Sequence, residues 1–464
     1  MITFVVRKNY YSIKTQDQKK MKVLKFGGTS VGSAARMKEV ARLICDGNQK
    51  IVVLSAMSGT TNSLVEISDY FYKSNTTGAI ERINVLEQKY MEVIDDLYST
   101  EKYKSESAKI IKSIFEYLRS FSTSVFTLFE EKAILAQGEM LSTNMFHLYL
   151  AEQGESSELL PALEYMRIDK NSEPDTAYIA ENLEKQLQAH AGFKYYITQG
   201  YICRNFYGEI DNLQRGRSDY TASLVGAAIK SSEIQIWTDI DGMHNNDPRF
   251  VEGTTPVPYL HFEEAAELAY FGAKILHPTC ILPAKLNNIP VRLLNTMEPD
   301  APGTLISMQS KKGTIQAVAA KDGITAIKIK SGRMLLAHGF MRKVFEIFES
   351  YQTSIDMITT SEVGVSITID NTKRLDEIVN NLKKLGTVTI DSNMVIICVV
   401  GDLPAENVGF QAKAVAAMKD IPVRMISYGG SNYNISFLIK AEDKKRALIA
   451  LSEGLFNKSA TNWF

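Results

Sequence analysis

The chain has 464 residues, of which 45% are hydrophobic and 23% charged, a balance typical of a globular protein of about two to four domains. Its 52 basic and 53 acidic residues give a formal charge of −1, which excludes a strong net attraction to nucleic acid or anionic lipid. The longest uninterrupted apolar run, Met394–Val400, is far shorter than the roughly 18 residues that cross a bilayer. We therefore expect a soluble, cytoplasmic protein.

Cysteine and histidine patterns do not predict a metal centre. The four cysteines form no CxxC pair, which favours reduced thiols in the cytoplasm. The six histidines form no HExxH or other metal-ligand spacing, so we predict no resident metal. Residues 1–20 lack the apolar core of a signal sequence, and Met21 stands directly before a strand-like run. We interpret residues 1–20 as an N-terminal extension.

From Met21 onward, short β-rich runs alternate with helical ones. A helix at Ala34–Cys45 separates the first two predicted strands, and this order predicts a parallel sheet with helices on both faces. The helix-rich, polar stretch Asn62–Leu150 is interpreted as a helical excursion from the sheet. The strands are predicted at Lys22–Phe26, Lys50–Ser55, Tyr195–Gln199, Gln235–Thr238 and Pro290–Leu294.

An internal repeat follows a predicted boundary at Ser307–Gly313. Gly339-Phe340 opens a helix that leads to the strand Val365–Ile369, and Gly409-Phe410 opens a second helix that leads to the strand Asn434–Ile439. Two such α+β units packed side by side would make a regulatory or dimerising module. The alternative is a coincidental similarity between two segments.

The first candidate site is Lys25-Phe26-Gly27-Gly28-Thr29-Ser30, at the end of the first strand. The two glycines allow a tight turn that presents backbone N–H groups to an anion, and a helix starting near Ser33 would add its positive dipole end. Lys25 could reach the same phosphate. An ordinary strand-to-helix turn is the alternative. No GxxxxGK[ST], GxGxxG or HRD and DFG set occurs, which disfavours the corresponding nucleotide enzymes.

Four further polar clusters lie downstream, at Ser55–Asn62, Gln137–Ser142, Arg215–Ala222, and Trp237–Arg249 followed by Phe271–Pro278. Taken singly, their residues also fit structural roles: a helix-surface acid (Glu139), an i,i+4 surface pair (Arg215 and Asp219), a turn (Asp247-Pro248) and a solvated charge (Lys274).

In this order, the clusters resemble the motifs of monofunctional aspartate kinases, which belong to the amino acid kinase family and carry paired ACT domains. The resemblance runs from Lys22 nearly to the C-terminus, and KFGGTS, RSDYTA, WTD…DPR and FGAKILHP are specific in combination. It implies a three-layer α/β/α amino acid kinase fold with a mostly parallel sheet at residues 21–312. It also implies two ferredoxin-like α+β ACT domains at 313–390 and 391–464, with the assignment of Ile315–Ala319 to either unit left open.

The resemblance implies ATP-dependent phosphorylation of the L-aspartate side-chain carboxylate to 4-phospho-L-aspartate, the first step toward lysine, threonine and methionine. The acceptor has a pKa of about 4 and is already ionised at neutral pH, so no general base is required. Such a site should supply positive charge and alignment, because phosphoryl transfer depends mainly on positioning and electrostatics. Magnesium would arrive with ATP, coordinated by phosphates and water.

Residue roles also follow from the resemblance. Lys25 would neutralise the transferred phosphoryl group and Asp219 would hold this lysine. Arg215 would clamp the substrate α-carboxylate and Glu139 would take its α-ammonium, in a pocket lined by Ser55, Thr61, Tyr201 and Ser218. The nucleotide would contact Lys25, the loop residues Gly27, Gly28 and Ser30, then Thr238 and Asp239 on its base and ribose side, and Asp247, Arg249 and Lys274 near its phosphates.

Three residues depart from the family pattern. Gln214 and Arg217 stand where the family usually has glycine, and Arg217 either points outward or adds a second cation to the site. His244 stands where many relatives carry a tyrosine near the nucleotide.

The C-terminal units resemble the lysine-responsive branch of the family. Asp356 would pair with an effector ammonium and the backbone near Gly339 would receive its carboxylate, although Ala337 replaces a common serine. We therefore predict feedback inhibition by L-lysine and a homodimer through the ACT domains, with a tetramer as the alternative assembly. The predicted effector residues are Met334, Gly339, Phe340, Ser354, Ile355, Asp356, Thr360, Ser361 and Glu362.

Three alternatives stay open from the sequence. The effector residues could only build the ACT interface. The whole chain could be a catalytically weak amino-acid sensor, or a related amino acid kinase that acts on another acidic substrate.

Overall fold

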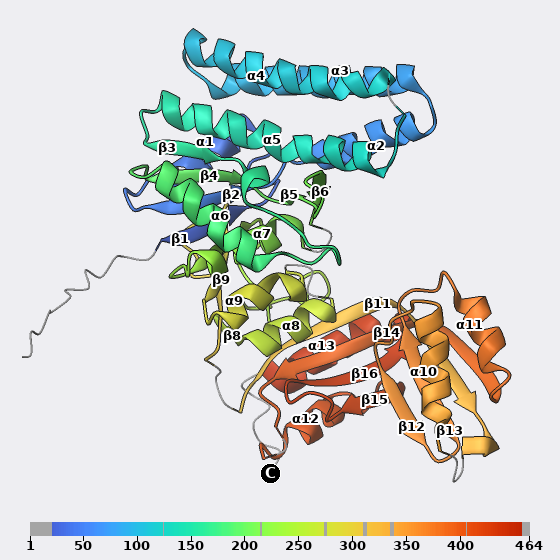
Figure 1. The fold of residues 1–464 in the computed structure, drawn as a ribbon. Helices are drawn as coiled ribbons and strands as arrows, with labels where there is room; N and C mark the ends of the chain where they lie inside the picture. Colours follow the sequence, from blue (N-terminus) through green and yellow to red (C-terminus); the bar gives the residue numbers. More distant parts are fainter. Residues whose placement is uncertain are drawn as a thin grey trace, which may run out of the picture.

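The computed structural model describes residues 21–123, 125–213, 216–272, 276–309, 313–334, 338–404 and 406–456. They form an N-terminal α/β part and a C-terminal α+β part (Figure 1). The predicted extension, residues 1–20, lies outside the described residues. Within them, no helix is both long enough and apolar enough to cross a bilayer. The cytoplasmic location stays a prediction.

An eight-stranded sheet organises the N-terminal part, in the order β3-β4-β2-β1-β7-β9-β10-β8. Every neighbouring pair is parallel except β9 with β10, which confirms the mostly parallel sheet. The strands are β1 (Lys22–Phe26), β2 (Lys50–Leu54), β3 (Ser157–Leu160), β4 (Tyr195–Gln199), β7 (Ile234–Thr238), β8 (Tyr259–His261), β9 (Val291–Asn295) and β10 (Thr304–Ser307).

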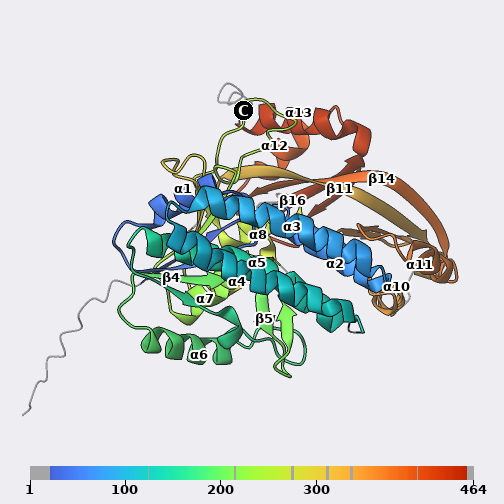
Figure 2. The same cartoon turned by 90° about the horizontal axis from the view of Figure 1, so that it is seen from above.

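Alternate residues of the central strands pack on opposite faces of this sheet. Val23 belongs to the core beneath α6 (Thr176–Ala189) and α7 (Arg217–Ala228). Leu24 and Phe26 belong to the core beneath α1 (Ala34–Ile44), which begins after the N-cap Ser33. Because helices cover both faces, β2 and β4 are buried along their whole length, and the predicted three-layer fold is confirmed (Figure 2).

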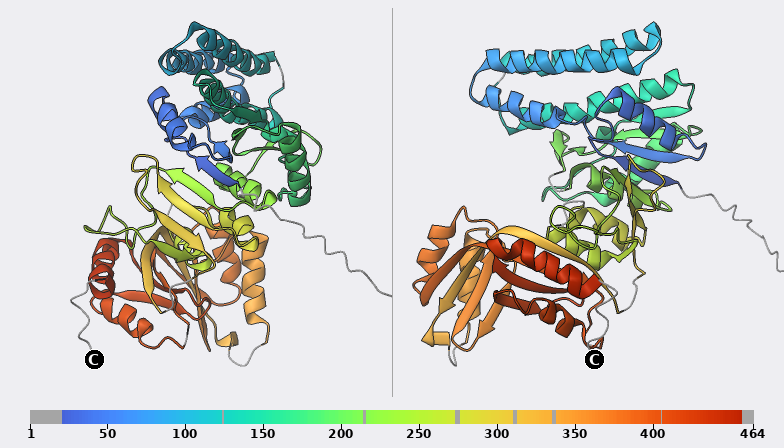
Figure 3. Two further views of the ribbon diagram at one scale, coloured as in Figure 1. Left: turned by 90° about the vertical axis from the view of Figure 1, so that its left-hand side faces the viewer. Right: turned by 180° about the vertical axis from the view of Figure 1, so that it is seen from behind.

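The predicted helical excursion is confirmed as four helices, α2 (Thr60–Tyr72), α3 (Thr76–Leu97), α4 (Glu101–Ser120) and α5 (Leu128–Glu152). The α3–α4 pair lies farthest from the C-terminal part (Figures 1 and 3). Buried aromatic rings join these two helices, with the Tyr90 and Phe115 centroids 5.9 Å apart in an edge-on arrangement. The hydroxyl of Tyr90 also hydrogen bonds with that of Thr60 at the start of α2, 2.9 Å away.

The predicted repeat forms one six-stranded antiparallel sheet, in the order β12-β13-β11-β14-β16-β15. Its strands are β11 (Ile315–Lys330), β12 (Ile358–Ser361), β13 (Gly364–Ile369), β14 (Thr387–Gly401), β15 (Val423–Tyr428) and β16 (Asn434–Lys440). The helices are α10 (Phe340–Ser350) and α11 (Leu375–Leu382) in the first unit, and α12 (Phe410–Ala417) and α13 (Lys444–Phe456) in the second.

The long strands β11 and β14 run through both units. Val318, near the start of β11, packs in the core of the second unit with Val395 and Phe437, whereas Ile327 packs in the core of the first. The two units therefore share their central strands. The domain boundaries after residues 312 and 390 stay predictions.

The remaining N-terminal elements include the hairpin β5 (Ile202–Arg204) with β6 (Ile210–Asn212), and the helices α8 (Phe262–Tyr270) and α9 (Leu282–Leu286). Helix α8 lies against the C-terminal sheet (Figure 1). The amide of Asn434 donates to Glu267 at 2.5 Å, and the ring of His261 stacks on Tyr433 with centroids 5.2 Å apart. These contacts join the two parts through α8.

Candidate active site

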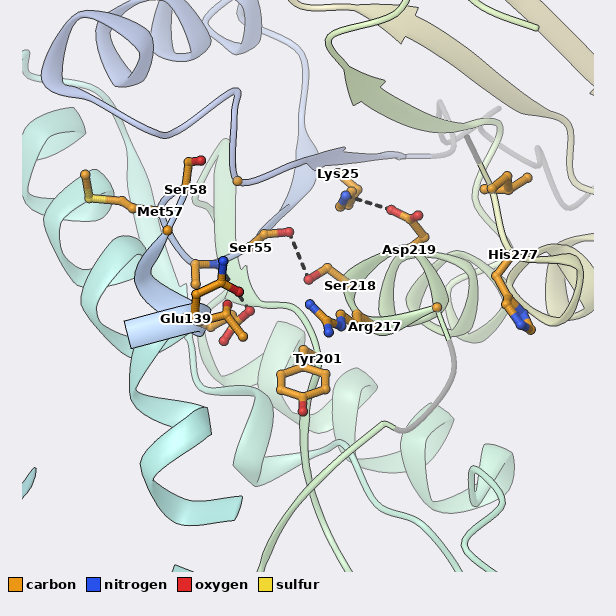
Figure 4. A pocket seen from close by; sticks show the side chains of 17 residues that line it. Lys25, Ser55, Met57, Ser58, Glu139, Tyr201, Arg217, Ser218, Asp219 and His277 are labelled. Carbon is orange, nitrogen blue, oxygen red and sulfur yellow. Dashed lines mark hydrogen bonds and ion pairs between the residues drawn. The ribbon is translucent and has the colours of Figure 1, made fainter. Parts of the chain in front are cut away.

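A cavity lies where the carboxyl ends of β1, β2 and β4 meet at one edge of the parallel sheet, the usual place for a ligand in an α/β fold. Its volume is about 490 Å³ (Figure 4). The lining residues come from the three loops, α2, α5, α7 and the segment after α8: Lys25, Gly28, Ser55, Ala56, Met57, Ser58, Gly59, Thr61, Asn62, Glu139, Tyr201, Gly216, Arg217, Ser218, Asp219, Leu276 and His277.

Two glycines allow the backbone to close around this cavity. A Cβ atom on Gly28 would lie 2.8 Å from the carbonyl oxygen of Ala56, and the Ser58 N–H donates to the Gly28 carbonyl at 3.0 Å. A Cβ atom on Gly200 would lie 2.3 Å from that of Ser218. Any larger residue at either position would push the loops apart.

Lys25 and Asp219 form an ion pair inside the cavity, with Nζ and Oδ1 2.7 Å apart. Lys25 is second to last in β1 and is only 9% exposed. Asp219 lies in the first turn of α7, the helix that covers this face of the sheet. The sequence prediction that these residues act together is consistent with this geometry.

Glu139 is buried in the middle of α5, with 5% exposure, so the interpretation as a helix-surface acid is wrong. Its carboxylate accepts a hydrogen bond from the Ala56 N–H at 3.1 Å. Burial raises its pKa to about 8, although that hydrogen bond and the charges of Arg217 and Lys25 act in the opposite direction. A cationic ligand group beside Glu139 would favour its ionised form.

The other predicted substrate residues also line the cavity. Ser55 donates through its hydroxyl to Ser218 at 3.0 Å, and Thr61 lies in the first turn of α2. Burial and the nearby Glu139 carboxylate raise the pKa of Tyr201 to about 12, so its phenol keeps its proton at neutral pH. Arg215 lies outside the described residues.

Arg217 is a cavity residue that the sequence prediction did not assign. Of the two alternatives for its side chain, the structure shows the inward one, near Ser218 and Tyr201 (Figure 4). Its guanidinium carbon lies 6.0 Å from the centre of the Tyr201 ring. The position inside the RSDYTA motif was the available signal. Eight further lining residues lie inside the recognised motifs without a predicted role: Ala56, Met57, Ser58, Gly59, Asn62, Gly216, Leu276 and His277.

Among the predicted nucleotide residues that the structure describes, Lys25 and Gly28 line this cavity, and Gly27, Ser30, Thr238, Asp239, Asp247 and Arg249 lie outside it. The Gly27 N–H donates to the Trp237 carbonyl at 3.2 Å, so it is not free to bind a phosphate here. The Ser30 hydroxyl is buried and hydrogen bonds with Thr296 at 2.7 Å. Thr238 ends β7, the strand beside β1, and its hydroxyl donates to the carboxylate of Asp239.

Asp247 and Arg249 form a bidentate ion pair in a turn, in which Nε of Arg249 lies 2.9 Å from Oδ1 of Asp247 and Nη2 lies 2.7 Å from Oδ2. The turn agrees with the structural interpretation of Asp247-Pro248. Although burial would raise the pKa of Asp247, hydrogen bonds from Arg249 hold it below its usual range. The neighbouring Asn246 donates to the carbonyl of Leu448 in α13, so the turn contacts the C-terminal part. Lys274 lies outside the described residues.

Nearby, His244 hydrogen bonds with Asp241 at 2.7 Å and Thr254 at 3.0 Å. Within the described ranges, no group of three or more His, Cys, Asp or Glu residues could hold a metal ion.

Among the predicted effector residues, Asp356 is already engaged. Its side chain is 1% exposed, and Oδ1 lies 2.6 Å from Nζ of Lys321 and 2.8 Å from the hydroxyl of Tyr270, the last residue of α8. Lys321 also pairs with Asp370 at 2.9 Å. Asp356 therefore joins the C-terminal sheet to the N-terminal part.

The other effector residues fall into two groups. Gly339 begins α10 with a φ of 80°, next to the core that contains Phe340 and is contacted by Met334 and Ile355. The second group, Ser354, Thr360, Ser361 and Glu362, is exposed on or beside the edge strand β12.

Comparisons with known proteins agree with the fold. The family model for the amino acid kinase family matches residues 20–295, and an ACT-domain model matches residues 397–455. Aspartokinase 1 (chloroplastic) of Arabidopsis thaliana is 34% identical over 94% of this chain and 80% of the relative. Lysine-sensitive aspartokinase 3 of Escherichia coli is 30% identical over 94% of this chain and 99% of the relative.

Among solved structures, E. coli aspartokinase III in complex with aspartate and ADP matches with a TM-score of 0.81 and 30% identity, over 94% of this chain and all of that chain. The chain therefore belongs to the amino acid kinase family, and within that family to the aspartokinases. It is an aspartate kinase, a phosphotransferase.

The buried position of Glu139 predicts a pH-dependent contribution to stability. Its pKa is about 8 in the folded chain against an ordinary value of 4.5, so between these values the unfolded chain loses the proton first and stability falls as pH rises. Urea unfolding at pH 5, 6.5 and 8 should show the free energy of unfolding of the wild type falling relative to Glu139→Gln by at least about 1 kcal/mol.

Glu131→Gln, on the same helix but outside the cavity, should keep the wild-type pH dependence. Identical pH dependence in the wild type and Glu139→Gln would contradict the prediction.

Proposed function

We propose that this aspartokinase transfers a phosphoryl group from ATP to the side-chain carboxylate of L-aspartate in the cavity at the ends of β1, β2 and β4, forming 4-phospho-L-aspartate. The observation that carries the proposal is that one cavity holds the Lys25–Asp219 ion pair, the guanidinium of Arg217 and the buried carboxyl of Glu139. An amino acid with two carboxylates and one ammonium is complementary to that set of charges.

Lys25 is proposed as the catalytic cation. The acceptor carboxylate and the phosphoryl group are both anionic, and their repulsion is the main obstacle to reaction. The ammonium of Lys25 would reduce this repulsion, and Asp219 would keep the ammonium in place through the ion pair at 2.7 Å. Because the acceptor is already ionised, no residue needs to remove a proton from it.

Glu139 is proposed to bind the substrate α-ammonium. In the described structure its nearest hydrogen-bond donor is the Ala56 N–H, and an ammonium placed beside it would lower its pKa from about 8 and ionise it. Ser55, Thr61, Tyr201 and Ser218 would line the amino acid pocket. The role of Arg215 as the α-carboxylate clamp rests on the family resemblance.

ATP is proposed to lie toward β7, which follows β1 in the sheet. Thr238 and Asp239 stand at the carboxyl end of that strand, on the same edge as the cavity. Mg²⁺ would be bound mainly by the ATP phosphates and water, which do not require a cluster of protein carboxylates. The described residues contain no such cluster. Asp247 and Arg249 would have to break the ion pair between them before they could contact the phosphates. The placement of Lys274 near the phosphates rests on the family resemblance.

L-lysine is proposed as the feedback inhibitor. The buried carboxylate of Asp356 forms an ion pair with the ammonium of Lys321. The same carboxylate is therefore suited to the ammonium of a free lysine molecule. An effector bound there would exchange with Lys321 and disturb the bond from Tyr270, which precedes the cavity residue Leu276 by only six positions. The E. coli relative named lysine-sensitive supports this choice.

A homodimer through the ACT domains, at residues 313–390 and 391–464, is proposed as the assembly. The edge strand β12 hydrogen bonds only with β13 in the described sheet, and Thr360, Ser361 and Glu362 are exposed there. An exposed strand edge is suited to pairing with a second copy. A tetramer built from two such dimers is the alternative assembly.

The acceptor specificity tests the proposed reaction. ADP release should depend on L-aspartate, with little rate from L-glutamate and none above background without an acceptor. Lys25→Ala should lower kcat by about 10²–10³-fold or more, because the charge on the transferred group loses its main counter-ion. Lys22→Ala, an exposed lysine of the same strand, is the control and should keep wild-type kcat.

No aspartate-dependent rate in the wild type would favour the amino-acid sensor, and a preference for L-glutamate would favour a related amino acid kinase.

Feedback inhibition is tested by titrating L-lysine, L-threonine and L-methionine against the aspartate-dependent rate. L-lysine alone should inhibit, and Asp356→Asn should raise the half-inhibiting lysine concentration by about ten-fold or more, because it removes a charge-assisted hydrogen bond. Asp376→Asn, an exposed acid in the same unit, should leave the curve unchanged. A flat lysine response in the wild type would refute the effector assignment.

The assembly is tested by light scattering of the full chain, with and without L-lysine. We expect twice the mass of one chain, or four times if the dimers associate. A monomeric mass in both conditions would contradict the proposed dimer.

A further inference from the structure

Arg217 carries a positive charge in the cavity that no described residue neutralises. Lys25 is paired with Asp219, whereas Arg217 makes no ion pair or hydrogen bond with the part of the chain that the structure describes. Its guanidinium carbon lies 6.0 Å from the centre of the Tyr201 ring, and its charge also acts on the buried carboxyl of Glu139. A guanidinium that faces a cavity and has no ion pair within the described ranges is suited to an anionic ligand.

The backbone around this arginine is strained. Arg217 has a φ of 45° and Tyr201 a φ of 68°, both in the left-handed region that favours glycine. Strained non-glycine residues persist where the surrounding structure enforces them, and they gather at functional sites. A glycine at position 217 would adopt this φ without strain, so the arginine is not explained by the stability of the turn.

The position of Arg217 selects which anion it would meet. In Figure 4 its side chain lies next to Ser218, to the right of Glu139 and below the Lys25–Asp219 pair. In the proposed function, Glu139 receives the ammonium end of the amino acid and Lys25 the phosphoryl group. The side-chain carboxylate of the acceptor would lie between these two ends.

We propose that Arg217 is a substrate-binding residue whose guanidinium binds the side-chain carboxylate of the acceptor amino acid; this rests on the proposed function. During transfer, one oxygen of that carboxylate forms a bond to the γ-phosphorus while the bond from phosphorus to the bridging oxygen breaks. The electron pair of the broken bond leaves with ADP, and no proton is exchanged. Arg217 offsets the negative charge of the acceptor as the two anions meet, and its planar fork orients the attacking oxygen.

The test compares glycine substitutions at two basic residues with a left-handed backbone conformation, Arg217 and Lys230. In Arg217→Gly, the KM for L-aspartate should rise about ten-fold or more, because a charge-assisted hydrogen bond is lost, while the KM for ATP changes less than about two-fold. The Tm should be unchanged or higher, since backbone strain is relieved. Arg217→Lys should give an intermediate aspartate KM, because it keeps the charge without the planar fork.

Lys230→Gly is the matched control. Lys230 is an exposed cation with a φ of 50°, just beyond the other end of α7 and outside the cavity. Its Tm should also be unchanged or higher, and both KM values should stay at wild type. If Arg217 had only a structural role, Arg217→Gly would lower the Tm, and the KM for L-aspartate would not rise more than the KM for ATP.

The inference is overturned if the aspartate KM of Arg217→Gly stays within about two-fold of wild type, or if the ATP KM rises equally. Should Arg217→Gly fail to fold, a wild-type aspartate KM in Arg217→Lys overturns it. These outcomes presume an active wild type assayed in parallel. A wild type without aspartate-dependent ADP release overturns the proposed function itself, and the two failures are thereby distinguished.

Discussion

The ion pair between Lys25 and Asp219 is the contact on which the cavity depends. Lys25 is only 9% exposed, and a buried ammonium is strongly unfavourable without an opposite charge, which Asp219 supplies from 2.7 Å. The pair forms only because β1 ends and α7 begins at the same edge of the sheet. Parallel strands with helical connections produce that coincidence, so the topology of the sheet is a precondition for the charge at the site.

With Lys25 neutralised by Asp219, the balance of the remaining groups sets the character of the cavity. Burial keeps the proton on Glu139 up to a pKa of about 8, which leaves Arg217 as the excess charge at neutral pH. The described lining residues therefore carry a net positive charge before a ligand enters. In the proposed function, an amino acid with two carboxylates would bring the missing negative charge, and its ammonium would bring the cation that Glu139 needs in order to ionise.

Local sequence patterns predicted the scaffold well because its signals are local. The apolar strands Lys22–Phe26 and Lys50–Leu54 are buried on both faces, and the two glycine-led helices of the repeat begin at Phe340 and Phe410 as expected. The direction of Arg217 could not be predicted, since it follows from left-handed backbone at positions 216 and 217. The family motif contains glycine at the second of these, so the resemblance carried no information about this side chain.

Contacts between residues far apart in the chain could not be predicted from the sequence either. Glu139 sits on a helix whose middle is buried all round, so no amphipathic pattern marks which face it occupies. Asp356 was assigned to an effector, yet its partners Lys321 and Tyr270 lie 35 and 86 positions away. The two C-terminal units are not consecutive segments of the chain, because the first half of the shared strand β11 contributes Val318 to the core of the second unit.

The junction at Asp356 shows how the two parts are able to influence each other through few contacts. Tyr270 bonds to Asp356, and two residues later a Cβ atom on Gly272 would lie 2.2 Å from the Ala320 carbonyl, beside Lys321. The end of α8 is thus fitted closely to β11, and the chain then runs on to Leu276 and His277 in the cavity wall. An ammonium that replaced Lys321 would exchange one cation for another at the same carboxylate. The net charge of the junction would hardly change, so the difference between the two states would reside in geometry, in whether Tyr270 and Gly272 keep their fit against β11.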